Sequence, residues 1–332
     1  TGASLSSDGG SILVGGDWQG SNGVRQAITT HLAAGATIDA GQGGVAVLWS
    51  DITNADSVTT VAGTVRALGG RIETSGNLLE LPGLVQAGAG GTWLIDPTNV
   101  TITTTSTTGT LAGDLASLAV TNIKATDIQA ALNAGTSVTV YASGTITVST
   151  ALTIANNTST AAILTLDSTA SAPTGGTAGT NTSAVSVNAA ITATGTGLTG
   201  LRIRTKGAPI KTTAGITLTG LIDFDNTVGL GVGTANAAEG ISLAGVLTST
   251  SGDITLVGRS SGAQGILTTG ASLITATTGN ISLTGSGTTG GVNLLAALSA
   301  GSGTKLRAIT LAGNGTSGIG VTASAAASLI AT

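Results

Sequence analysis

A stack of short parallel strands wound as a β-helix (β-solenoid) is the fold class that the sequence predicts, so the protein is expected to be all-β. The first observation is a phrase that recurs about every 27 residues, centred on Ile254, Ile281 and Ile309. The second is a set of Gly-apolar pairs that alternates with it: Gly240-Ile241, Gly265-Ile266, Gly291-Val292 and Gly318-Ile319. The third is a charged fraction of only 8%, against about 25% in ordinary soluble domains. Repeats of this length are typical of solenoids.

The individual strands are predicted by segments in which apolar residues alternate with Thr or Ser, because alternation gives a strand one buried face. Examples are residues 45–49, 138–140, 146–148, 164–166, 185–187 and 216–218. The 53 glycines supply the turns between strands. With coils of roughly 20–27 residues, the chain would make about 12–16 coils, spaced about 4.8 Å apart.

One short helix, near residues 126–135, interrupts the strand pattern. Thr126 is expected to cap it in a capping box with Gln129, and Gly135 is expected to end it. We therefore divide the chain into residues 1–102, a connection with the helix at 103–135, and repeats of about 25–28 residues at 136–332. Residues 21–35 are ambiguous between helix and strand, and a strand followed by a turn is favoured. Residues 168–183 are expected to form a loop.

Composition excludes several classes of function. Cysteine is absent, so the chain can form neither a disulfide nor a thiolate metal site. A net charge of -4 with scattered Lys and Arg argues against nucleic acid as a partner, because nucleic-acid binding needs a basic surface. No apolar run reaches the roughly 18 residues of a transmembrane segment. Few like charges keep neighbouring copies apart, so self-association, end-to-end or lateral, is expected.

The first half of the chain resembles a known family. The resemblance rests on blocks in a fixed order, followed by the segment at 128–140, and covers about residues 8–150. The blocks are Gly15–Gly20, Gly35–Ala40, Gly43–Asp51, Gly69–Gly76 and Gly91–Ile102. In this order they resemble the filamentous-haemagglutinin-like exoproteins, which are adhesins of the two-partner secretion family in Gram-negative bacteria.

This resemblance implies a right-handed parallel β-helix that is exported by an outer-membrane partner transporter. It further implies an extracellular location, with the protein displayed on the cell surface of a Gram-negative bacterium as a fibre or adhesin. The family has no catalytic residues to transfer in this region, so the resemblance implies architecture and export but no active site.

An oxygen-rich cluster, Asp223, Asp225 and Asn226, is a candidate calcium site, because carboxylate and amide oxygens are the ligands that Ca²⁺ prefers. The alternative is a solvated strand face with Phe224 turned into the core. No other metal or cofactor is expected.

Three tryptophans, Trp18, Trp49 and Trp93, are a candidate surface for stacking a cell-surface glycan. The alternative is that they pack inside the protein, because Trp49 and Trp93 both occur within apolar strands.

His31, the single histidine, is expected to be a partly exposed turn residue rather than a catalytic group. The glycine-rich segment 229–233 is interpreted as a turn. Four asparagines match the glycosylation pattern Asn-x-Ser/Thr but also suit the corners of coils: Asn157, Asn181, Asn280 and Asn314.

These observations favour a secreted structural or adhesive surface protein rather than an enzyme. The β-solenoid rod is expected to self-associate into a filament, sheath or matrix, or to mediate cell adhesion. The alternative is a β-helix enzyme that processes polysaccharides. Such enzymes need clustered charged or aromatic residues along a groove, and between residues 128 and 201 the single charged residue is Asp167.

Overall fold

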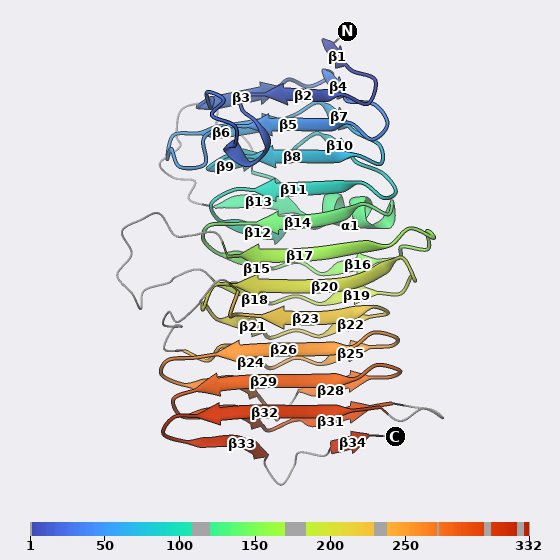
Figure 1. Cartoon of the computed structure of the whole chain (residues 1–332). Coiled ribbons are helices and arrows are strands. Elements are labelled where there is room, and N and C mark those ends of the chain that lie inside the picture. The colour runs from blue at the N-terminus through green and yellow to red at the C-terminus, as the bar shows by residue number, and fades with distance from the viewer. Residues whose placement is uncertain are drawn as a thin grey trace.

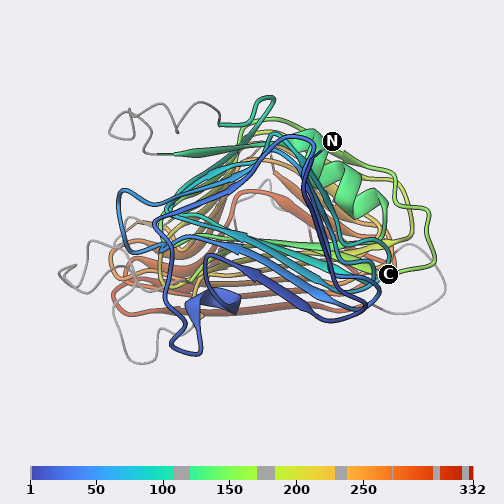
Figure 2. The same cartoon turned by 90° about the horizontal axis from the view of Figure 1, so that it is seen from above.

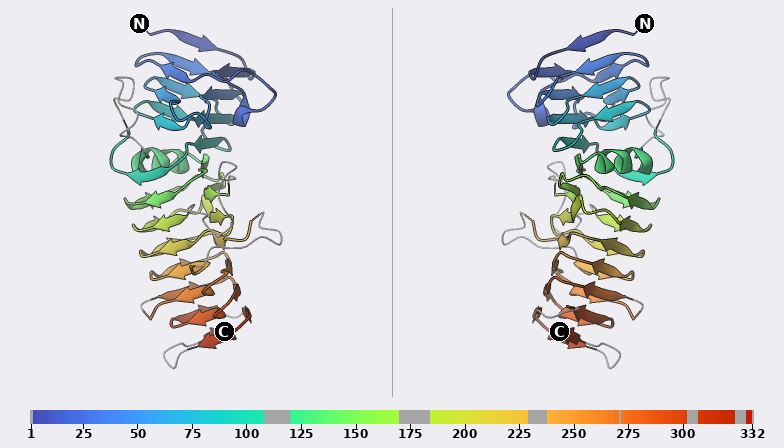
Figure 3. Two further views of the ribbon diagram at one scale, coloured as in Figure 1. Left: turned by 90° about the vertical axis from the view of Figure 1, so that its left-hand side faces the viewer. Right: turned by 90° about the vertical axis from the view of Figure 1, so that its right-hand side faces the viewer.

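The computed structural model of the chain is a parallel β-helix, as predicted. It describes residues 2–107, 120–169, 184–228, 238–270, 272–301, 307–323 and 329–331. Most of the predicted loop at 168–183, the glycine-rich segment 229–233 and Asn181 therefore lie outside the described residues. Each strand pairs in parallel with strands of the neighbouring coils, so the chain forms an elongated stack with its ends at opposite poles (Figures 1 and 3).

Three walls surround the core, which gives the stack a three-sided cross-section (Figure 2). One wall is a single sheet of eleven strands, here named sheet B. Its strands are β2 (Ser11–Val14), β5 (Val45–Trp49), β8 (Arg71–Ser75), β11 (Thr92–Asp96), β14 (Ser137–Tyr141), β17 (Ala162–Ser168), β20 (Leu198–Thr205), β23 (Leu221–Asp225), β26 (Ile254–Arg259), β29 (Ile281–Gly287) and β32 (Ile309–Gly315).

The second wall consists of sheet A, the helix α1 (Ala125–Asn133) and sheet E. Sheet A contains β1 (Ser4–Ser6), β4 (Thr37–Asp39), β7 (Thr64–Arg66) and β10 (Leu84–Gln86). Sheet E contains β16 (Leu152–Ile154), β19 (Ile191–Ala193), β22 (Ile216–Leu218), β25 (Leu247–Ser249), β28 (Leu273–Ala276), β31 (Ala297–Ala300) and β34 (Leu329–Ala331).

The third wall consists of sheets C and D. Sheet C contains β3 (Thr29–Leu32), β6 (Val58–Val61) and β9 (Leu78–Glu80). Sheet D contains, in spatial order, β13 (Thr121–Lys124), β12 (Val100–Thr103), β15 (Ile146–Val148), β18 (Val185–Val187), β21 (Ile210–Thr212), β24 (Ile241–Leu243), β27 (Gln264–Thr268), β30 (Gly290–Leu294) and β33 (Ile319–Ala323). Strand β13 is an extra strand in this wall, because it contacts β9 and pairs with β12.

Within the described residues, the number of coils is lower than predicted. Sheet B has eleven strands, which at about 4.8 Å spacing span roughly 48 Å. The estimate of 12–16 coils was wrong because several coils carry insertions, such as residues 15–28 between β2 and β3 and the segment that contains β13 and α1.

Columns of apolar side chains from successive coils fill the core. In sheet B, Ile254 pairs with Ile281 and Ile281 with Ile309, which confirms the first predicted repeat. In sheet D, Ile241, Ile266 and Val292 are also in register, but the next residue in the column is Val321, because Ile319 pairs with Gly290. Ile319 and Val321 are two residues apart and so lie on the same face of the strand. Spacing and alternation alone could therefore not predict which of the two joins the column of Val292.

The predicted helix is present as α1, but the predicted capping box is wrong. Lys124 is the N-cap residue and its side chain makes no capping hydrogen bond, while Thr126 lies inside the first turn. The C-terminus ends as expected. Gly135 has φ of 80°, and its N–H donates to Leu132 O at 3.0 Å, while Thr136 N–H donates to Ala131 O at 3.0 Å. This is a Schellman ending, which favours glycine.

Helix α1 takes the place of a strand between β10 and β16 (Figure 1). The side-chain oxygens of Gln129 and Asn133 accept hydrogen bonds from Thr153 N, at 2.6 Å, and Ala155 N, at 2.8 Å. Both amides belong to the β16 segment and would otherwise lie unpaired at the edge of sheet E, so the helix covers that edge.

Among the described residues, no helix has the length and apolarity that crossing a membrane requires.

Candidate functional site

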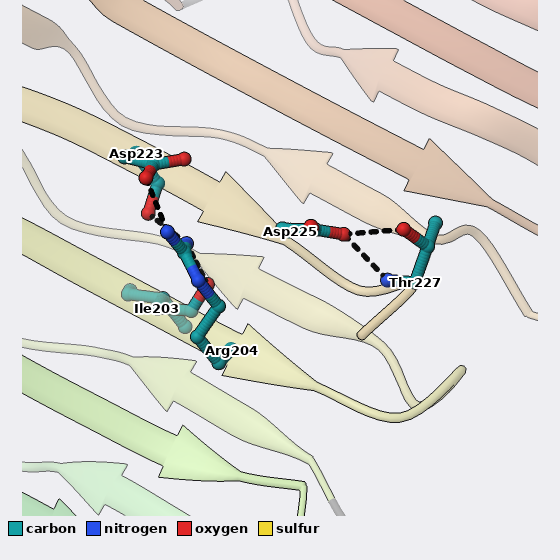
Figure 4. A network of polar contacts seen from close by, with 5 residues as sticks. All are labelled: Ile203, Arg204, Asp223, Asp225 and Thr227. Atoms are coloured by element: carbon teal, nitrogen blue, oxygen red, sulfur yellow. Dashed lines mark hydrogen bonds and ion pairs between the residues drawn. The ribbon is translucent and has the colours of Figure 1, made fainter. Parts of the chain in front are cut away.

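The acidic cluster predicted as a calcium site lies at β23. Asp223 forms an ion pair with Arg204 of β20, and the Arg204 guanidinium also donates to Asp223 O at 2.8 Å (Figure 4). The Asp225 carboxylate instead accepts two hydrogen bonds from Thr227, at 2.7 Å from the backbone N and 2.6 Å from Oγ1. The two carboxylates therefore have separate partners.

Asn226, the third predicted ligand, is fully buried. Its Oδ1 accepts from Arg259 N at 2.7 Å and its Nδ2 donates to Arg259 O at 2.9 Å, so the amide joins its coil to the next one. The three side chains do not converge on one point. Throughout the part of the chain that the structure describes, no three His, Cys, Asp or Glu residues gather as a metal site would require. Calcium binding stays a prediction, and this geometry adds no support to it.

The three tryptophans do not share one exposed face. Trp49 and Trp93 are buried, at 1% and 2% exposure, and their indole N–H groups donate to Gln26 Oε1 at 2.9 Å and Thr74 Oγ1 at 3.0 Å. Trp18 is partly exposed, and its ring lies 4.8 Å from the guanidinium carbon of Arg71, within the range of a cation–π contact. Of the three, Trp18 alone has ring surface that a glycan could reach.

The remaining sequence candidates occupy ordinary surface positions. His31 is exposed on β3, beside Thr60 of β6, and so lies in a strand rather than a turn. Asn280 joins neighbouring coils: it bonds to Asp253 Oδ1 through its backbone N at 2.7 Å, and its own Oδ1 accepts from Ala308 N at 3.0 Å. This is the corner role that was the alternative to glycosylation for these asparagines.

Residues 15–28, here named the flap, leave the coil after β2 and fold over the outer side of sheet B (Figure 1). The flap contains a short 3₁₀ turn at Trp18–Gly20 and returns to β3, so the strand interpretation of residues 21–35 is confirmed at Thr29–Leu32. Trp49 requires a glycine at position 16. A Cβ on Gly16 would lie 2.3 Å from Trp49 Cδ1, a distance that no side chain tolerates.

Glu73, an outward residue of β8, is fully buried close to the flap. Its carboxylate accepts hydrogen bonds from Gln19 N in the flap and from Ser75 Oγ, both at 2.9 Å. Burial raises the pKa of Glu73 to about 7, and the neighbouring Asp17 adds to the rise, while the two hydrogen bonds oppose it. Glu73 is therefore partly protonated at neutral pH.

Asp96 lies one strand further along, with Ser75 beside it in register. It is 3% exposed, and no described residue donates a hydrogen bond to its carboxylate. Burial, with smaller contributions from the charges of Glu73 and Asp167, raises the pKa of Asp96 to about 8. Two neighbouring carboxyl groups thus carry protons near neutrality, which is typical of acid–base sites, but neither is open to a substrate in this structure.

The sequence analysis missed both acids. Alternation places Glu73 and Asp96 on the outward face of their strands, where a charged residue is ordinarily solvated. The one available signal was Trp49, an outward-facing tryptophan in the same sheet, because a large apolar ring on an outer face calls for a covering segment.

The first and last described coils continue the core columns. Strands β1, β2 and β3 are the first strands of their sheets, and β32, β33 and β34 are the last strands of theirs among the described residues. Leu5 of β1 is in register with Ile38, a core residue. Leu329 of β34 is in register with the core residue Leu298.

No protein-family model matches the chain, and no curated protein matches it either.

Proposed function

We propose that the protein is a structural or adhesive surface rod that associates with further copies of itself into a filament, sheath or matrix. The observation that carries this proposal is the regular three-walled stack of parallel strands in a chain with only 8% charged residues. Long outer faces with few like charges leave little to keep neighbouring copies apart.

The contact between copies would be made by outward rows of the walls. In sheet D, for example, Thr147 of β15 and Ser186 of β18 lie side by side in such a row. The low charge of the chain, 8% of residues, leaves little repulsion between copies.

The setting of this role is proposed from the sequence resemblance. We propose that the rod lies outside a Gram-negative cell, that an outer-membrane partner transporter exports it, and that it acts at the cell surface in cohesion or adhesion. A short exposed aromatic contact at Trp18 and Arg71 is compatible with glycan binding but does not by itself define a glycan site.

Assembly is tested by adding like charges to the outer surface of the stack. We expect wild-type protein to form larger assemblies as its concentration rises, and Thr147→Lys/Ser186→Lys to remain single, because two like charges then lie side by side in an outward row of sheet D. Thr147→Gln/Ser186→Gln is the matched control: it changes the same two side chains without adding charge and should assemble as wild type. Sedimentation velocity and electron microscopy measure the size of the assemblies. Single wild-type rods at every concentration, or normal assembly of Thr147→Lys/Ser186→Lys, would contradict the proposal.

A second candidate, a polysaccharide-processing enzyme, is favoured by the buried acids Glu73 and Asp96. Their raised pKa values suit a general acid. Movement of the flap would be needed to expose Glu73, whose carboxylate accepts a hydrogen bond from Gln19 N in the flap. Release of soluble products from a panel of polysaccharides, lost in Glu73→Gln, would support this activity. No release by the wild-type protein from any member of the panel would dismiss it.

A further inference from the structure

Sheet E carries a regular array of threonines on its outer side. The pattern Thr-x-Thr occurs at the end of four successive strands: the first threonine lies within the strand and the second directly follows its last residue. The first threonines are in register from strand to strand. No pairing from β16 to β31 contains a register shift. The eight residues, here named the threonine array, are Thr192, Thr194, Thr217, Thr219, Thr248, Thr250, Thr275 and Thr277. Thr153 and Ser299 extend the first row by one strand at either side.

The hydroxyl groups of the first row are available. Among the described residues, none of Thr192, Thr217, Thr248 and Thr275 uses its side chain in a hydrogen bond within the protein. In the second row, Thr219 Oγ1 donates to Gly195 O at 3.0 Å, while Thr194 and Thr250 are exposed. The array therefore presents one row of free hydroxyls and methyls, and a second row that is partly free.

Charge separates sheet E from sheets B and D. Neither a charged nor an aromatic residue occurs in its strand segments 151–155, 190–194, 215–219, 246–250, 273–277 and 297–301. The equivalent outward row of sheet B includes Arg202 and Asp223, and that of sheet D includes Lys211. The uncharged face with an ordered row of threonines is thus specific to sheet E and does not follow simply from the composition of the chain.

The array has the dimensions of a small two-dimensional lattice. Neighbouring strands lie about 4.8 Å apart, and alternate residues along a strand lie roughly 6.6 Å apart. Threonine is branched at Cβ and stiff at χ1, and parallel pairing on both sides holds each strand. The hydroxyls and methyls of the first row are therefore ordered before any ligand arrives. These two spacings are close to the repeats between water molecules on a prism face of hexagonal ice.

We propose that the threonine array binds ice. The hydroxyls would replace lattice water molecules and hydrogen-bond their neighbours, and the methyl groups between them would hold water in an ordered layer. A crystalline polysaccharide is a poorer fit, because sheet E lacks the aromatic faces on which sugar rings stack. The inference does not rest on self-association, because one rod carries the whole array.

The test measures whether dilute, single rods adsorb to ice. We expect wild-type protein to depress the freezing point below the melting point, to slow ice recrystallisation and, when fluorescently labelled, to coat a growing ice crystal. The double variant Thr217→Lys/Thr248→Lys should lose most of all three effects, because two charged side chains project from the centre of the array.

Two controls keep the test decisive. Thr165→Lys/Thr255→Lys makes the same change at outward threonines of sheet B and should retain wild-type activity. Thr217→Val/Thr248→Val keeps the shape, the methyl groups and the strand preference, so it should fold as wild type by circular dichroism and still lose ice-binding activity.

The proposal is overturned if wild-type rods leave ice growth unchanged, or if the sheet B variant loses as much ice-binding activity as the array variants. It is also overturned if the face pairs two copies and adsorbs no ice.

Discussion

Phe224→Ala is expected to lower the free energy of unfolding by about 3–5 kcal/mol, the usual cost of removing a buried phenylalanine ring. Phe224 is fully buried in the middle of the stack, between Ile203 of β20 and Leu256 of β26. Backbone pairing on both sides fixes the distance between these coils. The walls therefore cannot collapse into the cavity, and the cost should lie toward the upper part of that range.

Equilibrium denaturation in urea, followed by circular dichroism, measures this loss. Phe224→Leu keeps most of the volume and should cost less than about 1.5 kcal/mol. Leu295→Ala, at a residue that is 38% exposed, should stay within about 0.5 kcal/mol of wild type. If Phe224→Ala costs no more than Leu295→Ala, then the core columns do not hold the coils together in the way that their burial indicates.

The same columns explain why the fold class could be predicted. Ile254, Ile281 and Ile309 recur at nearly constant spacing and are in register in sheet B, because a parallel stack brings equivalent positions of successive coils together. Alternation around each of them then identifies the inward face. Both signals are local or periodic, so they are visible without knowledge of the tertiary structure.

The threonine array shows where periodicity stops being informative. Its first-row threonines are separated by unequal lengths of chain, since the coils between them carry turns of different length. Thr217 and Thr248 are further apart in the sequence than Thr248 and Thr275, yet each pair is in register. The pattern Thr-x-Thr is visible in the sequence, but its meaning depends on a register that only the folded stack defines.

The buried acids could not be predicted for a different reason. Glu73 has the alternation of a solvated outward residue, and its burial depends on Gln19, which lies 54 positions earlier in the chain. The capping box at Thr126 failed similarly, because helix α1 begins directly from strand β13. In both cases a tertiary contact overrides a sound local pattern.

The buried acids have a large consequence for stability as a function of pH. In the unfolded chain their pKa values return to about 4, and in the folded protein they are raised to about 7 for Glu73 and about 8 for Asp96. Between these limits the folded protein retains protons that the unfolded chain releases, so rising pH favours unfolding. We expect the stability contributed by protonated acids to be fully present below pH 4, to fall as pH rises, and to be lost above pH 8.

The size of this loss follows from the pKa differences, at about 1.4 kcal/mol for each unit. From ordinary pKa values of 4.5 for Glu73 and 3.8 for Asp96, it is on the order of 3 kcal/mol for Glu73 and 6 kcal/mol for Asp96. Asp96→Asn removes the titration with almost no change of shape. Its stability should therefore resemble wild type near pH 4 and exceed it by several kcal/mol near pH 9.

Urea denaturation at pH 4.5, 6.5 and 8.5 checks this expectation, with Asp8→Asn as the control. Asp8 is an exposed carboxylate remote from the flap, so its removal should leave the wild-type pH profile unchanged. A wild-type protein that gains stability between pH 5 and 8.5 would contradict the assignment, as would an Asp96→Asn variant that keeps the wild-type slope. Either result would mean that water reaches these carboxylates in the folded protein. Glu73→Gln should remove the smaller part of the slope, and the double variant should have an almost flat profile, because the two acids are the most strongly shifted carboxyl groups of the described chain.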